Sequence, residues 1–196
     1  MGPRIAPLNA PYAADVDEHL RKLMPPGMDP LTLFRVVAHN PRVLGRMRRG
    51  GLLDPGSITV RQREIVILRT TARCRSEYEW GVHVAFFGAA AGLSDAQVAA
   101  TVLGSASDPS WSDEDSRLIA AADALHEGAA IDDELWTALA RVFDAAQLIE
   151  IVFLAGLYHA VSFVTNATRL EPEVGAPRFP ERPPIRVSLD QVTSAR

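Results

Sequence analysis

The sequence is short of several residue types, and each shortage argues against a class of protein. Cys74 is the only cysteine among 196 residues, so no disulfide forms within the chain, as is typical of a reducing compartment. Lys22 is the only lysine, which argues against Schiff-base chemistry. The net charge of −4 argues against nucleic acid as a main partner, and we expect none. The arginines at 46–49 and 61–63 form only short basic patches.

Long apolar runs are missing as well. No stretch approaches the roughly 18 apolar residues of a membrane span. The nearest one, IEIVFLAGLYHAVSFVTN, is interrupted by Glu150, His159 and Ser162. The first residues also lack the apolar core of a signal peptide. We therefore expect a cytoplasmic protein with no membrane partner.

Period-2 alternation, which marks a half-buried strand, is absent, and nearly the whole sequence between the two ends is typical of helices. The predicted fold class is therefore all-α, with several helices in one domain. The expected N-caps are Ser57, Ser94, Ser112 and Asp144. The expected helices cover 30–39, about 57–74, 77–91, a stretch opening at 94, about 112–128, 132–143 and 145–166.

Prolines gather at both ends of the chain. Because proline removes a backbone donor and fixes φ, we expect residues 1–16 to be an N-terminal arm and residues 171–196 a proline-rich C-terminal tail. Residues 17–170 then form the helical domain. Its apolar helices, among them 151–164, exceed what a small bundle can cover, so we predict a homo-oligomer: a dimer, a trimer or a multiple of these. Proline-rich arms suit wrapping around a neighbouring copy.

The segment CRSEYEWGVH, residues 74–83, gathers many reactive groups. Glu79 and His83 are four residues apart and so share a helix face, where a carboxylate and an imidazole can hold and pass a proton. Glu64 lies on the apolar stripe of the preceding helix, where a carboxylate needs a partner or its proton. If the two helices pack antiparallel, Glu64 faces the Glu79–His83 pair.

Structural interpretations exist for the same residues. A glutamate and a histidine at this spacing are common as a surface pair. Tyr78 and Trp80 are residues of the kind that fill cores and interfaces, and Cys74 is typical of a small buried side chain. Two ligands at helical spacing are too few for a metal site, so we expect no metal.

The stretch RQREIVILRTTARCRSEYEWGVHVAFFGAAAGLSDAQV resembles the carboxymuconolactone decarboxylase family, whose fold is shared with alkylhydroperoxidase D. The most specific features are Glu64, the YEW of residues 78–80, and His83. In the peroxidase branch of this fold, a Cys-x-x-Cys motif precedes the histidine. Its two cysteine positions fall here on Ser76 and Glu79, so the chain resembles the decarboxylase branch, which lacks the redox thiols.

The resemblance implies a cofactor-free enzyme that performs decarboxylation or a related proton transfer on a small organic acid or lactone. His83 would donate or shuttle the proton, and Glu79 would orient the His83 ring. Glu64 would be a second acid of raised pKa. The implied substrate-binding residues are Tyr78, Trp80 and Arg61, of which Arg61 would bind a substrate carboxylate unless it is simply a solvated surface residue.

Two other functions stay open from sequence. One is an alkylhydroperoxidase-like antioxidant protein that uses Cys74 alone. The other is a non-catalytic helical oligomer that binds a small molecule. The resemblance itself also implies a homo-oligomer and a small-molecule partner.

Overall fold

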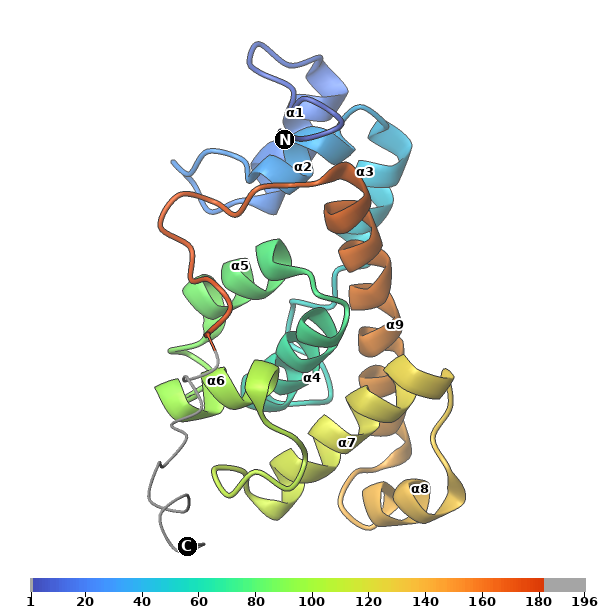
Figure 1. Cartoon of the computed structure of the whole chain (residues 1–196). Helices are drawn as coiled ribbons and strands as arrows, with labels where there is room; N and C mark the ends of the chain where they lie inside the picture. Colours follow the sequence, from blue (N-terminus) through green and yellow to red (C-terminus); the bar gives the residue numbers. More distant parts are fainter. Residues whose placement is uncertain (1, 182–196) are drawn as a thin grey trace, which may run out of the picture.

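Our computed structural model describes residues 2–181, and in this range all regular secondary structure is helical (Figure 1). The prediction of an all-α fold is therefore confirmed. The helices are α1 (Ala14–Leu23), α2 (Thr32–Val37), α3 (Pro41–Arg49), α4 (Val60–Arg73), α5 (Glu77–Phe87), α6 (Asp95–Leu103), α7 (Asp113–Gly128), α8 (Asp133–Ala140) and α9 (Ala145–Thr168).

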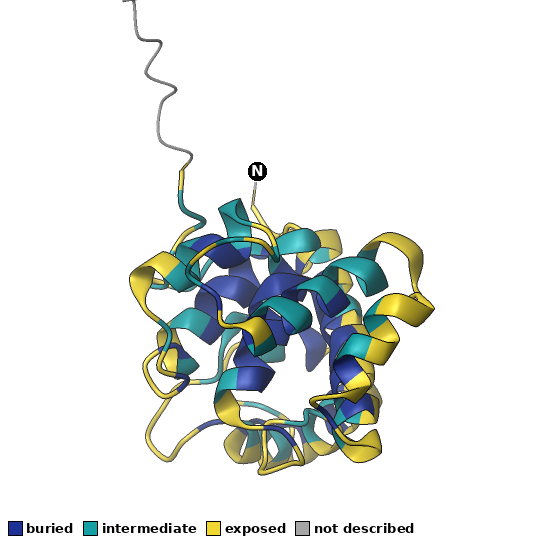
Figure 2. Cartoon of the chain, turned by 90° about the horizontal axis from the view of Figure 1, so that it is seen from below, coloured by how far each residue is buried: buried dark blue, intermediate teal, exposed yellow. Residues whose placement is uncertain are grey.

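Helix α4 is the central element. Every residue from 62 to 71 is buried, including charged ones, so α4 is enclosed on all sides rather than along one stripe. It packs against α5, α6, α7 and α9. Figure 2 shows buried segments in the middle of the chain and exposed ones around them. A carboxylate on α4 is therefore held away from water and must be paired within the protein.

Two apolar clusters fill the interior. One joins α4, α7 and α9 through residues such as Ile67, Leu118 and Leu154. The other joins the N-terminal helices to α5 and α9 through residues such as Leu33 and Val82. Helix α9 therefore contributes to both clusters, and α5 joins the N-terminal helices while it packs on α4.

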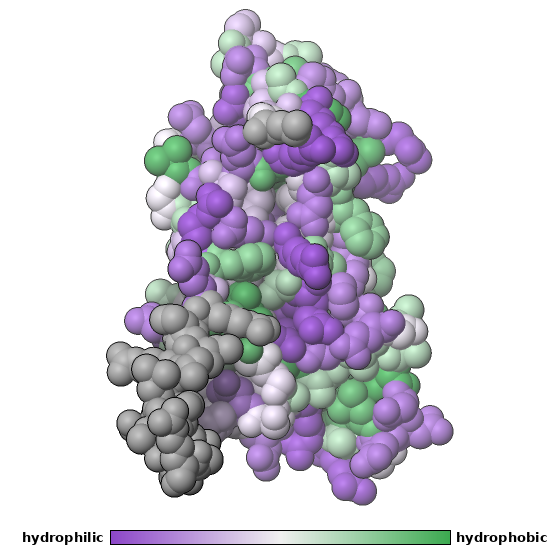
Figure 3. Space-filling model, in the orientation of Figure 1, coloured by the Kyte–Doolittle hydropathy of each residue, from purple (hydrophilic) through white to green (hydrophobic). Residues whose placement is uncertain are grey.

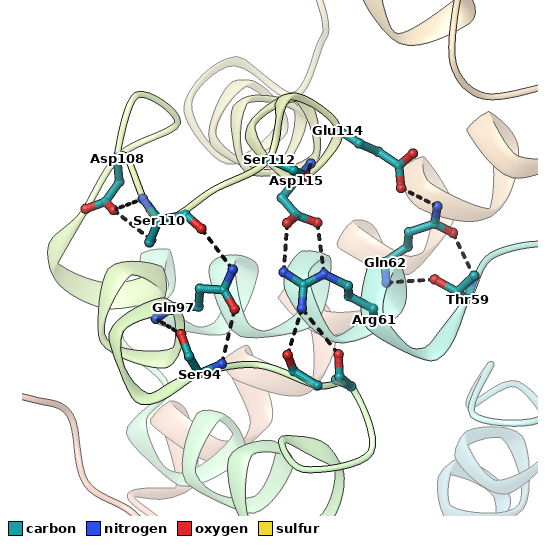
Figure 4. Close-up of polar contacts among 12 residues, drawn as sticks. Thr59, Arg61, Gln62, Ser94, Gln97, Asp108, Ser110, Ser112, Glu114 and Asp115 are labelled. Atoms are coloured by element: carbon teal, nitrogen blue, oxygen red, sulfur yellow. Dashed lines mark hydrogen bonds and ion pairs between the residues drawn. The ribbon is translucent and has the colours of Figure 1, made fainter.

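Side-chain caps fix most of the helix starts. Ser94, Ser112 and Asp144 each accept a backbone hydrogen bond in the first turn of the helix that follows, as predicted. The cap of α4 is Thr59, not Ser57: Thr59 and Gln62 form a capping box (Figure 4). Ser57 instead donates its backbone N–H to Glu150 at 2.6 Å, which leaves the helix to begin later than expected.

The Asn40–Pro41 pair both ends one helix and begins another. The predicted stop after residue 39 is confirmed, since α2 ends at Val37. We did not expect α3 to follow at once. Asn40 caps it, and Pro41 occupies the first turn, where the missing N–H costs nothing.

The described parts of both ends pack against the chain itself. Near the N-terminus, the backbone N–H of Arg4 donates to Thr168 at 2.8 Å, and α1 already begins at Ala14. At the other end, the Phe179 N–H donates to Glu77 at 2.9 Å, and the Phe179 ring meets Trp80 edge-on. The C-terminal segment to residue 181 thus lies along α5. The rest of the predicted tail, 182–196, is outside the described residues.

Helix α9 is long and apolar enough, by length and composition alone, to cross a membrane. Core helices of soluble proteins have the same properties, and in this structure α9 packs against α4, α5, α7 and α8. Its outer face is nevertheless apolar: Ile149, Phe153 and Phe163 are 70%, 61% and 63% exposed. Figure 3 shows hydrophobic side chains along the edge where α9 lies.

Candidate active site

A cavity of about 430 Å³ lies between the N-terminal helices, α5 and α9. Its wall is mainly apolar. The ionisable side chains that line it are Glu79, His83, Tyr158 and Lys22. Most apolar side chains of the wall come from α1, α2, α5 and α9; they include Leu23, Leu31, Leu33, Phe34, Val82, Phe86, Phe87, Leu157 and Val161. Such a wall favours a small ligand with a hydrocarbon body and few polar groups.

The imidazole of His83 lies between two carboxylates. Its Nδ1 is 2.7 Å from Glu64 Oε2, and its Nε2 is 3.5 Å from Glu79 Oε1. All three side chains are buried, and Glu64 is fully so. The packing of α5 on α4 therefore brings together the three residues that we expected to be catalytic.

The roles within this group differ from the expected ones. We expected Glu79, one turn from His83, to orient the ring, but the short hydrogen bond comes from Glu64 on the neighbouring helix. Glu64 lies behind His83 and does not line the cavity, whereas Glu79 does. The Oε2 atom of Glu79 is buried and has no hydrogen-bond partner among residues 2–181. Glu64 thus positions the ring, and Glu79 is available to a ligand.

Arg63 completes a row of alternating charges and was missed in the sequence. Its Nε donates to Glu64 at 2.9 Å, its Nη1 donates to the Leu53 carbonyl at 2.8 Å, and its guanidinium lies over the Phe87 ring. From sequence, Arg63 is only part of the short basic patch at 61–63. The apolar residues three and four positions after Arg63 could have shown that it faces the interior.

Tyr158 is the other residue that sequence analysis missed. Its ring meets His83 edge-on at 4.9 Å, and it lines the cavity. Burial, together with the charges of Glu79 and Glu64, raises the pKa of Tyr158 well above its usual value. The phenol therefore keeps its proton and can donate a hydrogen bond to a ligand.

His83 is charged at neutral pH. Burial alone lowers its pKa, but the hydrogen bonds and negative charges of Glu64 and Glu79 outweigh burial and raise the pKa from 6.5 to about 9. The ring is therefore an imidazolium that holds a proton next to the cavity. Its charge and that of Arg63 offset the two carboxylates.

This raised pKa predicts how stability depends on pH. Because the folded protein binds the His83 proton more tightly than the unfolded chain, the stabilisation is complete below pH 6.5 and is lost as pH rises through about 9. We expect the free energy of unfolding, measured by urea denaturation, to fall across this window. In His83→Gln the fall should be much weaker, and an unchanged slope in that variant would contradict the assignment.

Two of the predicted substrate-binding residues, Tyr78 and Trp80, are not on the cavity wall. Tyr78 accepts a hydrogen bond from the Leu33 N–H at 2.9 Å and donates to Glu173. Trp80 donates from Nε1 to Thr101 Oγ1 at 2.9 Å. A buried phenol or indole needs a polar partner, and here the partners are Leu33, Glu173 and Thr101 of the protein itself.

Arg61, the third predicted substrate-binding residue, also lies away from the cavity. It forms a two-point ion pair with Asp115 of α7, with the closer contact at 2.8 Å, and donates to the Gly92 carbonyl (Figure 4). These bonds join the starts of α4 and α7 to the loop after α5. The role of Arg61 is therefore structural, and Arg61 is not part of the proposed site.

The positions of the redox thiols hold no sulfur. Ser76 is buried and its hydroxyl bonds to Thr165, while Glu79 lines the cavity. Cys74, the only cysteine, does not line the cavity. Burial raises the pKa of its thiol, so the reactive thiolate is disfavoured.

The arrangement of the helices is an alkylhydroperoxidase D-like fold. Residues 41–124, from α3 into α7, match the model of the carboxymuconolactone decarboxylase family, so the resemblance seen in the sequence is confirmed. No curated protein matches the chain.

Solved structures share the fold at low sequence identity. An uncharacterized peroxidase-related protein from Silicibacter sp. TM1040 is 16% identical with a TM-score of 0.74, covering 91% of this chain and 96% of that one. An uncharacterized peroxidase-related protein from Ralstonia eutropha JMP134, described as an alkylhydroperoxidase AhpD core, is 13% identical with a TM-score of 0.71, covering 86% of this chain and 93% of that one. The debrominase Bmp8, in complex with 2,3,4-tribromopyrrole, is 17% identical, TM-score 0.70, covering 88% and 93%.

Proposed function

We propose that this protein catalyses acid–base chemistry, a decarboxylation or a related proton transfer, on a small organic acid or lactone bound in the cavity. The observation that carries the proposal is the orientation of His83. Its Nδ1 is held by Glu64, and its Nε2 faces Glu79, which lines the cavity. A proton donor fixed by one carboxylate and adjacent to a second, unsatisfied one is suited to deliver and recover a proton.

In a decarboxylation, the bond between the substrate carbon and its carboxylate breaks. Carbon dioxide leaves, and the electron pair stays on the substrate. The imidazolium of His83 then gives its Nε2 proton to that carbon and is reprotonated from water through Glu79. The contact of 3.5 Å between Nε2 and Glu79 is long, so Glu79 can move aside while Glu64 keeps the ring in place. Tyr158 supplies a further hydrogen bond to the substrate.

Thiol chemistry suits this cavity poorly. A peroxidase cycle needs a reactive thiolate, but Cys74 does not line the cavity and burial raises its pKa. We therefore expect hydroperoxide turnover to be weak at most. A robust thiol-dependent peroxidase activity of the purified protein that is lost in Cys74→Ser would restore the antioxidant function as the better alternative.

The test is a turnover assay on small acids and lactones, beginning with 4-carboxymuconolactone, with loss of carbon dioxide as the readout. Activity should depend on His83 and Glu79 and survive Cys74→Ser. His39→Gln is the matched control, because His39 is an exposed histidine bonded only to a backbone carbonyl. Ligand binding without turnover of any compound would favour the non-catalytic binding protein, and 2,3,4-tribromopyrrole serves as the apolar probe.

We also propose that the chain forms a homo-oligomer through the outer face of α9, where Ile149, Phe153 and Phe163 are exposed. Light scattering at micromolar concentration should give a multiple of the 21.3 kDa chain mass. Phe153→Asp should shift it toward the monomer, because burying a carboxylate in an apolar interface is costly. Val174→Asp, at an exposed apolar residue outside α9, is the control. A monomeric parent protein would refute this proposal.

A further inference from the structure

A second cluster of chemically active side chains lies outside the cavity. Cys74 at the end of α4, His126 in the last turn of α7 and His159 in α9 meet at the surface between these helices. Cys74 Sγ is 3.8 Å from His126 Nδ1, which is 3.1 Å from His159 Nε2. One donor atom from each residue lies within 4.8 Å of the other two. None of them lines the cavity or takes part in the proposed reaction.

Hydrogen bonds to neighbouring groups hold two members of the cluster in place. His159 Nδ1 donates to the Ala155 carbonyl at 2.8 Å, which leaves the lone pair of Nε2 directed at the cluster. Asn166 Nδ2 donates to the Cys74 carbonyl at 2.8 Å and fixes that residue beyond the end of α4. Hydrogen bonds of this kind orient the ligands of metal sites.

Two of the three distances between the donor atoms are close to those of tetrahedral coordination. With metal–nitrogen bonds of about 2.0–2.1 Å and metal–sulfur bonds of about 2.3 Å, a tetrahedral site separates two nitrogens by about 3.4 Å and a nitrogen and a sulfur by about 3.6 Å. The observed 3.1 Å and 3.8 Å are each within a few tenths of an ångström of these values. Small side-chain movements are enough to close the site.

We propose that Cys74, His126 and His159 bind one zinc ion, with the fourth coordination position open to water or an exogenous ligand. One thiolate and two imidazoles are the donor set that zinc takes, whereas magnesium and calcium require oxygen ligands. The residues are only partly buried, so an ion can enter from solvent. The expectation of no metal rested on the Glu79–His83 pair of one helix, and this site has ligands from three.

The charges near the site are compatible with a cation. Arg73, on α4 next to Cys74 in the sequence, is paired with Asp123 and Glu127 of α7. Zinc would cross-link the end of α4 to α7 and α9, so binding should raise the thermal midpoint.

The experiment uses the full-length protein, stripped with a chelator and titrated with zinc by competition calorimetry. We expect one zinc per chain. Cobalt(II) should give the visible spectrum of a tetrahedral ion together with a thiolate-to-cobalt charge-transfer band. Each of His126→Gln and His159→Gln should weaken zinc binding by more than the roughly 10- to 100-fold typical of losing an outer-shell partner. Cys74→Ser should also abolish the charge-transfer band.

His39→Gln and His83→Gln are the controls, and both should bind zinc as the parent does; His83→Gln also separates this site from the proposed active site. Circular dichroism identifies any ligand variant that fails to fold, and the remaining ligand variants then decide. Failure of the parent to bind zinc at micromolar concentration, or zinc affinity unchanged in the folded ligand variants, would overturn the proposal.

Discussion

Replacing His83 with glutamine is expected to lower turnover by about 10²- to 10⁴-fold, the usual contribution of a general acid or base. The glutamine keeps a polar group between Glu64 and Glu79 but has no proton to give. Steady-state kinetics on a substrate found by the assay above, at pH 7, measures the effect. His39→Gln should leave kcat and KM unchanged, because that histidine is on the surface.

The structure also changes what to expect of the stability of this variant. From sequence, a histidine at a cavity wall should contribute little to stability. His83 is instead buried between two carboxylates, so its loss leaves buried negative charge less well compensated. Activity must therefore be compared per folded molecule. A variant that melts far below the parent and yet keeps its specific activity would make His83 a structural residue.

Glu64→Ala is expected to be the most destabilising single change in the site, by roughly 3–5 kcal/mol, the range for breaking a buried ion pair by removing one partner. Glu64 is fully buried and bonds to Arg63 at 2.9 Å and to His83 at 2.7 Å, so its removal leaves two buried cations without their shared anion. Urea denaturation at pH 7 gives the difference in free energy of unfolding.

The matched control for Glu64→Ala is Glu18→Ala. Glu18 also pairs with a basic residue, Lys22, but on the exposed face of α1, where solvent screens the pair. We expect little change in stability there. Equal effects of the two substitutions would show that the row of charges beside the cavity contributes no more than a surface pair.

The sequence predicted this site in outline because its main clues are local. The apolar neighbours of Glu64 placed it in the interior, and helical spacing placed Glu79 next to His83. Spacing along one helix cannot give a contact between two helices, however. The shorter bond, from Glu64 on α4 to His83 on α5, depends on how those helices pack, so we assigned the orienting role to the wrong glutamate.

Partners that are distant in sequence explain the other differences. Arg61 and Arg63 lie two residues apart and share the same neighbours in the sequence. In the structure, Arg61 pairs with Asp115 on α7, whereas Arg63 donates to the buried Glu64. Sequence spacing also could not reveal the role of Tyr158 or the cluster of Cys74, His126 and His159, because their contacts join different helices. Helix starts, in contrast, depend on capping residues within four positions, and of the four expected N-caps only Ser57 was misplaced.

Because Gly81 lies so close to Pro177, the path of the C-terminal segment depends on which residue α5 has at position 81. A Cβ atom at position 81 would overlap the Pro177 carbonyl oxygen, so any other residue there forces the segment onto a new path. Gly81 lies midway between Glu79 and His83. We therefore expect the cavity to be distorted in a chimera that joins these helices to the C-terminal segment of a homologue. Exchanging α5 together with that segment should avoid the distortion.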